Sequence, residues 1–409
     1  MTKKTETPAE SETETAQAIP DYLLSTNLQP DSMLMRLLER GSSKRVREAP
    51  TEDLGLAEHL PFPFMALVGQ MEMRIALLLS VINPNVGGVL LVGPRGTGKT
   101  TAARGLSDLL PYVASSTCPY GCMPEDFAAQ GEDGVCDDCA AKLRAGQSIT
   151  RMEPVRLVEL PLNARLDDVV GGINERLAMQ SNRVQIERGI LSRADRNILY
   201  VDEVNLLGDE IVDAILDAAA QGQYTVRRGP VRATYRARFV LIGSMNPEEG
   251  TLRPQILDRF GLRVLVSGLA DADGRITVYD RVRRFRENPR AFIQTFEEET
   301  YFAREDVMSA RELLPSVKLT PEAQLVGLQL VQELGVHSHR AEFTTFEAAR
   351  AHAAADGRSE ATVGDVKAVA SMALRMRRSE YMDKFFESQQ SEEQTINNLI
   401  NKLAPGEAA

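Results

Sequence analysis

The chain has 409 residues, of which 43% are hydrophobic and 26% charged, and its formal net charge is −11 at pH 7. This length exceeds one domain of about 100–200 residues, so we expect two folded units with tails. The acidic balance argues against a nucleic-acid partner, because a broad binding surface needs Lys and Arg to neutralise phosphates. No apolar run approaches the ~20 residues needed to span a bilayer, and no secretory signal is visible. We therefore expect a cytoplasmic protein without membrane insertion.

Residues 1–58 are rich in Thr, Glu, Ser and Pro. Such a segment buries too little apolar surface to offset the entropy of ordering, so we predict a disordered acidic tail. Folding is expected to begin at Pro61. An amphipathic pattern then predicts a helix over residues 71–82, which ends before Pro84.

A glycine-rich segment follows and matches the phosphate-loop pattern G-x-x-x-x-G-K-[ST] in full. It consists of Gly93, Pro94, Arg95, Gly96, Thr97, Gly98, Lys99 and Thr100. The apolar run 89–92 predicts a buried strand before it, and 101–110 predicts a helix after it. Backbone N–H groups of such a loop cradle phosphates. Lys99 is expected to reach the β- and γ-phosphates of ATP, and the Thr100 hydroxyl to bind Mg²⁺.

The remaining pattern predicts an α/β fold with a doubly wound, mainly parallel sheet, followed by helices. Four further apolar runs predict strands at 155–160, 197–201, 238–243 and 262–266. We place the α/β domain at 59–270, an all-α domain at 271–385 and an acidic tail at 386–409. Thr320 is predicted to cap a helix with Pro321 at its first position. The basic run 281–286 is predicted to be a solvated helix face.

Two carboxylates, Asp202 and Glu203, end the predicted strand at 197–201. Carboxylates at the end of a buried strand are costly unless they have a role. Asp202 suits a position near Mg²⁺, and Glu203 suits polarisation of an attacking water. A solvated acidic pair is the alternative, which the complete phosphate loop earlier in the chain disfavours.

Two further polar residues, Asn246 and Arg259, flank predicted strands. The Asn246 amide, after the strand at 238–243, is expected to orient water against the γ-phosphate, although Asn-Pro is also a common turn. Arg259 precedes the strand at 262–266 and could stabilise transition-state charge; a surface ion pair with Asp258 is the alternative.

The four cysteines of the chain are Cys118, Cys122, Cys136 and Cys139. Two closely spaced pairs in a reducing compartment are typical of a closed tetrahedral Zn²⁺ site. A redox switch is the competing interpretation. The phosphate chemistry does not require this cluster, so we do not expect a catalytic role for it.

Taken together, these motifs resemble the ATPase subunit I of magnesium chelatase, an AAA+ family. The resemblance rests on residues 63–70, the phosphate loop, Tyr200–Leu207 and Gly243–Leu262, and it covers roughly residues 62–376. It implies an AAA+ ATPase domain with a helical lid, which hydrolyses MgATP to drive Mg²⁺ insertion into protoporphyrin IX in (bacterio)chlorophyll biosynthesis for photosynthesis.

The same resemblance implies roles for individual residues. Lys99 and Thr100 would bind phosphate and Mg²⁺, Asp202 and Glu203 would serve as the Walker B pair, and Asn246 as a sensor. Arg259 would be an arginine finger offered to the neighbouring subunit and held in place by Asp258. Arg340 would be the sensor-2 arginine of the lid. A β-hairpin insertion around 169–173 is also implied.

The same resemblance implies self-association into a hexameric ring. It further implies a middle subunit with AAA+ and von Willebrand-type domains and a large porphyrin-binding subunit. Arg188-Gly189 and Arg196-Asn197 depart from the family's usual residues at these places. Two alternatives therefore stay open: a related ATPase that serves cobalt chelation, and one that remodels or matures a protein complex with a von Willebrand-type partner.

Overall fold

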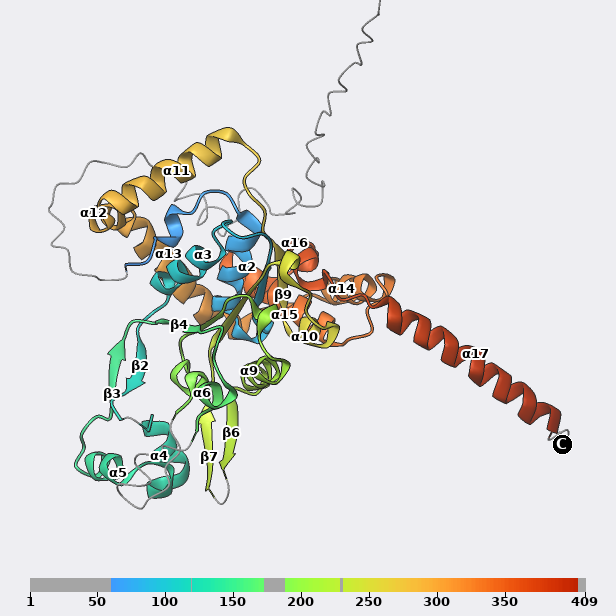
Figure 1. Ribbon diagram of the computed structural model, residues 1–409, viewed down its shortest axis with the longest axis horizontal. Coiled ribbons are helices and arrows are strands. Elements are labelled where there is room, and N and C mark those ends of the chain that lie inside the picture. The colour runs from blue at the N-terminus through green and yellow to red at the C-terminus, as the bar shows by residue number, and fades with distance from the viewer. Residues whose placement is uncertain (1–59, 119, 173–187, 229–230, 404–409) are drawn as a thin grey trace, which may run out of the picture.

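The computed structural model describes residues 60–118, 120–172, 188–228 and 231–403 (Figure 1). The predicted disordered tail, residues 1–58, lies outside these ranges. Across the described part of the chain, no helix combines the length and apolarity needed to cross a bilayer.

A five-stranded parallel sheet forms the centre of the molecule. Its order is β4-β5-β8-β1-β9. The strands are β1 (Val89–Val92), β4 (Leu157–Leu160), β5 (Ile198–Val201), β8 (Val240–Met245) and β9 (Leu262–Leu265). All five predicted strands are present with bounds shifted by at most two residues, so the predicted α/β fold class is confirmed.

Both faces of this sheet are covered, because its strands are buried and successive side chains point to opposite sides. Val89 and Leu91 join the core that contains α2 (Met71–Ile82) and α3 (Lys99–Leu106). Leu90 and Val92 join the second core, which contains residues of four helices on the opposite face. These are α6 (Leu166–Val170), α8 (Ile190–Arg193), α9 (Asp209–Gln221) and α10 (Pro254–Arg259). The sheet is therefore doubly wound, and the predicted helix at 71–82 is confirmed.

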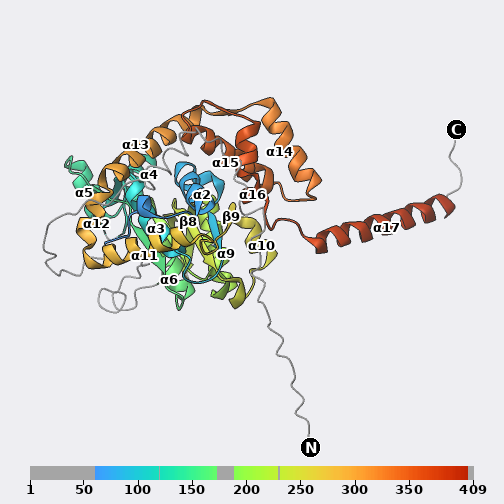
Figure 2. The same ribbon diagram turned by 90° about the horizontal axis from the view of Figure 1, so that it is seen from above.

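Helices dominate the chain after β9. They are α11 (Ala272–Glu287), α12 (Pro289–Thr295), α13 (Glu297–Leu313), α14 (Pro321–Glu333), α15 (Arg340–Ala355), α16 (Val363–Leu374) and α17 (Glu380–Leu403). The Thr320 hydroxyl accepts a hydrogen bond from the Ala323 N–H at 3.2 Å, which confirms the predicted cap of α14. A two-residue parallel ladder joins β10 (Lys318–Leu319) and β11 (Glu360–Ala361). Helix α17 projects away from the body in both views (Figures 1 and 2).

Two antiparallel ribbons extend from the α/β part (Figure 1). One pairs β2 (Val113–Ser116) with β3 (Thr150–Glu153), and α4 (Pro124–Gln130) and α5 (Asp137–Arg144) lie between these strands in the sequence. The other is the hairpin β6 (Gln223–Arg228)–β7 (Val231–Arg236). Neither ribbon was predicted from the sequence.

The expected β-hairpin insertion around residues 169–173 is wrong for its first part, because Val169 and Val170 end helix α6. The Arg165 N–H donates to the Asp168 carboxylate at 2.9 Å and so fixes the start of this helix. Residues 173–187 lie outside the described ranges.

A buried guanidinium ties the helical part to the sheet. Arg377 follows α16 and donates to the Asp258 carboxylate at 2.8 Å, and to the carbonyl oxygens of Phe260 and Gly261 at 3.3 and 3.0 Å. Its side chain is fully buried. This single residue therefore donates hydrogen bonds to the backbone carbonyl oxygens of the segment that leads from α10 into β9.

We expect Arg377→Met to destabilise this junction strongly. The change removes the donor to two carbonyl oxygens and the nearest cation of Asp258. Breaking a buried ion pair typically costs about 3–5 kcal/mol, and we expect the lower end of this range because the Asp258 side chain is 27% exposed and keeps the Ser338 hydroxyl. Urea unfolding followed by circular dichroism measures the loss. The matched control is Arg286→Ala, because Arg286 is exposed on α11. Equal stability of the two variants would contradict the assigned role.

Candidate active site

The phosphate loop follows β1 and leads into α3 as predicted. Gly93 has no room for a side chain, since a Cβ there would lie 1.9 Å from the Val266 carbonyl oxygen. Gly96 and Gly98 have φ angles of 78° and 88°, a region that favours glycine. Gly98 caps α3, so the amino terminus of this helix opens on the adjoining cavity. Such a terminus favours anionic ligands.

Lys99 is held at the mouth of its own loop. Its ammonium donates to the carbonyl oxygens of Gly93 at 2.7 Å and Pro94 at 2.8 Å. Burial lowers the pKa of Lys99, while the nearby carboxylates of Asp202 and Glu203 act in the opposite direction. An ammonium has three protons, so one donor is left for a ligand in the cavity.

A tyrosine hydroxyl links the loop to the predicted acidic pair. Tyr200 donates to the Asp202 carboxylate at 3.0 Å, and the Thr100 hydroxyl oxygen lies 2.9 Å from the same phenol oxygen. Burial raises the pKa of Tyr200 to about 12, so the phenol stays protonated. Because its proton is given to Asp202, Thr100 must be the donor to Tyr200. The lone pairs of Thr100 then remain free for a cation.

Ser244 of β8 fixes both carboxylate residues. Its hydroxyl donates to the Asp202 carboxylate in a short hydrogen bond and accepts from the Glu203 N–H at 3.1 Å. Glu203 has a φ of 47°, which is uncommon for a residue with a side chain. The Ser244 contact therefore supports a strained backbone that turns Glu203 out of the strand direction.

The Glu203 carboxylate is paired with the loop. Arg95 donates to it at 2.8 Å and also contacts the Glu249 carboxylate. The hydrogen bond with Glu203 raises the pKa of Arg95. A water molecule that Glu203 orients would have to share this carboxylate with Arg95.

These residues meet in one cavity of about 640 Å³. Its predicted members are Arg95, Gly96, Thr97, Gly98, Lys99, Thr100, Asp202, Glu203 and Asn246. Gly93 and Pro94 do not line the cavity, but their carbonyl oxygens accept hydrogen bonds from the Lys99 ammonium, which does. The cavity is thus bounded by polar residues after β1, β5 and β8, as parallel strands with a common direction require.

Sequence reasoning missed the other wall of the cavity. Val278, Arg281 and Val282 of α11 line it together with apolar residues near Leu67. The prediction that 281–286 is a solvated face is wrong for Arg281, which is buried and donates to the Ala66 carbonyl at 2.8 Å. The i, i+3, i+4 spacing of 278, 281 and 282 is the signal that could have revealed this face.

Arg259 and Arg340 are not among the residues that line this cavity. Arg259 ends α10 and pairs with Asp217 at 2.9 Å and Asp213 at 3.1 Å, both on α9. Arg340 is about half exposed, and its guanidinium lies 3.8 Å from Asp258. Both arginines therefore lie at or beside α10 and outside the lining of their own chain's cavity.

The expectation that Asp258 holds Arg259 in place is wrong. Asp258 binds Arg377 and accepts from the Ser338 hydroxyl at 2.7 Å, whereas Arg259 turns to α9. Consecutive residues of a helix point in different directions, so neighbours in sequence do not pair.

The four cysteines gather in a separate cluster and do not line the cavity.

We expect Tyr200→Phe to weaken the response to Mg²⁺. The change removes the hydroxyl that orients both Thr100 and Asp202, and loss of such supporting hydrogen bonds typically costs about 10–100-fold in metal affinity. The Mg²⁺ concentration for half-maximal ATP hydrolysis should rise by at least about tenfold. Tyr112→Phe is the matched control, because Tyr112 is 58% exposed. An unchanged Mg²⁺ dependence would contradict the role of Tyr200.

Comparison with known proteins places this site in a family. Residues 174–261 match the family model for magnesium chelatase, subunit ChlI, and residues 328–399 match that for the AAA lid domain. The chain is 44% identical over 345 residues to the magnesium-chelatase subunit ChlI homolog of Methanocaldococcus jannaschii. The aligned region covers 84% of this chain and 91% of that protein. It is 41% identical over 318 residues to magnesium-chelatase subunit ChlI of Guillardia theta, covering 77% and 89% of the two chains.

A solved structure of the complex between subunits BchI and BchD of magnesium chelatase is 36% identical, covers 80% of this chain and 99% of that chain, and has a TM-score of 0.44. The identities and coverage of the ChlI relatives decide the assignment. The chain belongs to the family of magnesium-chelatase ChlI subunits, the AAA+ ATPase component of that enzyme.

Proposed function

We propose that this protein hydrolyses MgATP as the motor subunit of a chelatase that inserts Mg²⁺ into protoporphyrin IX, in the pathway to (bacterio)chlorophyll. One observation carries the proposal: a complete phosphate loop, two carboxylates and an asparagine amide border the same cavity in a chain of the ChlI family. The Mg²⁺ that enters the macrocycle is a substrate, distinct from the ion that accompanies ATP.

The residues of the loop suit the polyphosphate of ATP. The amino terminus of α3 offers backbone N–H groups, and the Lys99 ammonium adds a positive charge at the loop mouth. The apolar wall formed by Leu67, Val278 and Val282 suits the nucleoside end of the ligand.

Thr100 and Asp202 fit the accompanying Mg²⁺. Both offer hard oxygen ligands, and Tyr200 holds the two side chains with lone pairs left over. Asp202 acts directly or through water. When bound there, the ion neutralises charge on the phosphate oxygens.

Glu203 and Asn246 serve the attacking water. Glu203 accepts a hydrogen bond from this water once Arg95 shares or releases the carboxylate, and Asn246 holds the water against the terminal phosphate. Asn246 lies at the end of β8, where its side-chain oxygen accepts from the Glu248 N–H at 3.3 Å. The amide N–H₂ remains available as a donor.

A ring completes the site. Arg259 and Arg340 approach the ATP of an adjacent subunit, where a guanidinium stabilises transition-state charge. A head-to-tail interface that closes by rotation places one subunit's α10 surface against the next subunit's nucleotide. We propose a hexamer, as the family's assembly implies, working with a middle subunit that has AAA+ and von Willebrand-type domains and a large porphyrin-binding subunit, in the cytoplasm.

The test is a reconstituted chelation assay. The purified chain is combined with the middle and large subunits from its source, ATP, protoporphyrin IX and either Mg²⁺ or Co²⁺, and product is followed by fluorescence or absorbance. We expect Mg²⁺ insertion that requires ATP. Glu203→Gln should bind ATP yet lose at least about 100-fold in both hydrolysis and insertion, because general-base assistance contributes about 10²–10⁴-fold. Lys99→Ala should lose ATP hydrolysis.

Other outcomes assign the protein differently. Insertion of Co²⁺ alone would replace the magnesium assignment by cobalt chelation. ATP hydrolysis without insertion of either metal, accompanied by ATP-dependent rearrangement of a von Willebrand-type partner, would overturn chelation in favour of remodelling. A Glu203→Gln variant that hydrolyses ATP at the parental rate would overturn the assigned role of Glu203.

A further inference from the structure

The four cysteines come from two turns of the ribbon between β2 and β3. Cys118 and Cys122 follow β2, where Gly121 has a φ of 73° and its N–H donates to the Cys118 carbonyl at 3.0 Å. Cys136 caps α5, and Cys139 lies in its first turn. Each pair therefore presents two thiols from a tight, hydrogen-bonded turn.

The sulfur positions fit a tetrahedron. The Sγ atoms of all four cysteines lie within 4.8 Å of one another. That of Cys118 is 3.7 Å from Cys122 and 3.6 Å from Cys136. Four sulfurs placed about 2.3 Å from one zinc ion are about 3.8 Å apart. A disulfide needs about 2.05 Å, so the observed spacing matches a shared ion.

Backbone donors also point at the sulfurs. The Tyr120 N–H lies 3.4 Å from the Cys118 sulfur, and the Cys136 N–H lies 3.3 Å from the Cys122 sulfur. Hydrogen bonds of this kind stabilise thiolates, the form in which cysteine binds metal.

This segment has almost no apolar core of its own. The buried cluster around residues 117–149 consists of Cys122, Cys139 and Ile149, with Val135 and Leu143 among the partly buried residues packed against it. Units shorter than about 40 residues usually need a metal, a disulfide or a partner to stay folded. The cysteines thus occupy the place of a core, which a bound ion would stabilise.

We propose that Cys118, Cys122, Cys136 and Cys139 bind one structural zinc ion. Four thiolates fill a tetrahedral coordination shell and leave no open position, which is the arrangement of structural zinc sites. Soft sulfur ligands disfavour Mg²⁺, so this site is chemically separate from the Mg²⁺ ligands at the phosphate loop.

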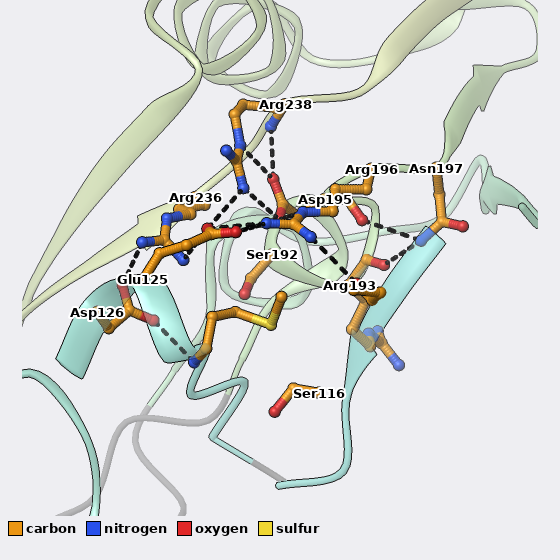
Figure 3. Close-up of polar contacts among 12 residues, drawn as sticks. Ser116, Glu125, Asp126, Ser192, Arg193, Asp195, Arg196, Asn197, Arg236 and Arg238 are labelled. Carbon is orange, nitrogen blue, oxygen red and sulfur yellow. Dashed lines mark hydrogen bonds and ion pairs between the residues drawn. The ribbon is translucent and has the colours of Figure 1, made fainter. Parts of the chain in front are cut away.

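The zinc-bound segment is fastened to the α/β core by α4, which starts two residues after Cys122. Glu125 of α4 accepts from the Arg196 guanidinium at 2.6 and 2.8 Å and lies 3.2 Å from that of Arg236 (Figure 3). Asp126 pairs with Arg236 at 2.6 Å. We call this group of Glu125, Asp126, Arg196 and Arg236 the carboxylate clasp.

The clasp reaches two elements of the ATPase core. Arg236 ends β7, and Arg196 lies just before β5, the strand that Asp202 directly follows. The Arg196 N–H donates to the Arg238 carbonyl at 2.6 Å, and Arg238 in turn pairs with Asp195 (Figure 3). A zinc ion bound by the cysteines would therefore fix the position of α4. Through Glu125 and Asp126, α4 contacts the start of β5 and the end of β7 in the β6–β7 hairpin.

Elemental analysis of the full chain, purified without chelator, tests the ion. We expect one zinc per chain, and visible bands of tetrahedral cobalt thiolate after exchange with Co²⁺. Cys136→Ser and Cys139→Ser should lose the zinc, whereas Lys99→Ala should keep it while losing ATP hydrolysis. Metal-free protein with a disulfide among the four cysteines would overturn the proposal in favour of redox control, and stoichiometric iron would overturn the zinc assignment.

Hydrogen exchange tests the link through the clasp and separates it from failure to fold. Cys139→Ser should speed exchange in residues 117–149 and in β6–β7. Glu125→Gln should speed exchange in β6–β7 while keeping one zinc per chain. If β6–β7 exchanges at the parental rate in both variants, the clasp does not transmit the effect of zinc. Neither result depends on chelatase activity, so this inference stands or falls separately from the proposed function.

Discussion

The phosphate loop and the acidic end of β5 are joined by one phenol, that of Tyr200. Its hydroxyl lies between the side-chain oxygens of Asp202, two residues further on, and Thr100, 100 residues earlier in the sequence. Strand register makes this meeting possible, because β8 lies between β5 and β1 and pairs with both. Ser244, opposite Leu91 in that register, adds the second contact with Asp202. A shift of one residue in β5 or β8 would turn these side chains to the other face of the sheet.

Burial explains why this small polar group has a defined geometry. Tyr200 is almost fully buried, so its hydroxyl has to find partners within the protein. The same requirement governs Arg377, which binds carbonyl oxygens and a carboxylate between α10 and β9. One polar cluster thus positions the side chains of Thr100 and Asp202, and another connects the helical part to the sheet.

Much of this arrangement could be predicted from sequence, since it depends on short-range patterns. The strand, glycine loop and helix of residues 89–106 follow from apolar runs and from a complete motif, and the cap at Thr320 follows from local hydrogen bonding. The grouping of Asp202 and Asn246 follows from the common direction of parallel strands.

Long-range pairing could not be predicted in this way. Arg281 looked solvated within a basic run, but the position of α11 over Ala66 buries it. Asp258 and Arg259 looked like a pair, yet each finds its partner on a different element, Arg377 and Asp217. The carboxylate clasp likewise joins segments separated by at least 70 residues. These contacts depend on how elements are placed in three dimensions, which no local pattern encodes.

Arg259 does not line the cavity of its own chain and instead pairs at α10 with the acidic residues of α9. The proposed mechanism requires Arg259 of a neighbouring subunit to reach the ATP bound by this one. An arginine supplied in trans contributes about 10³–10⁵-fold to turnover in GTPases, so its absence should be easy to detect.

Mixing two inactive variants tests this claim most directly. Arg259→Ala and Lys99→Ala are each expected to assemble and to hydrolyse ATP at background rates. Titrating one into the other should restore part of the phosphate release, because some interfaces then pair an intact Lys99 with an intact Arg259. Background activity at every ratio, with mixed rings demonstrated by co-purification of differently tagged chains, would contradict a shared site.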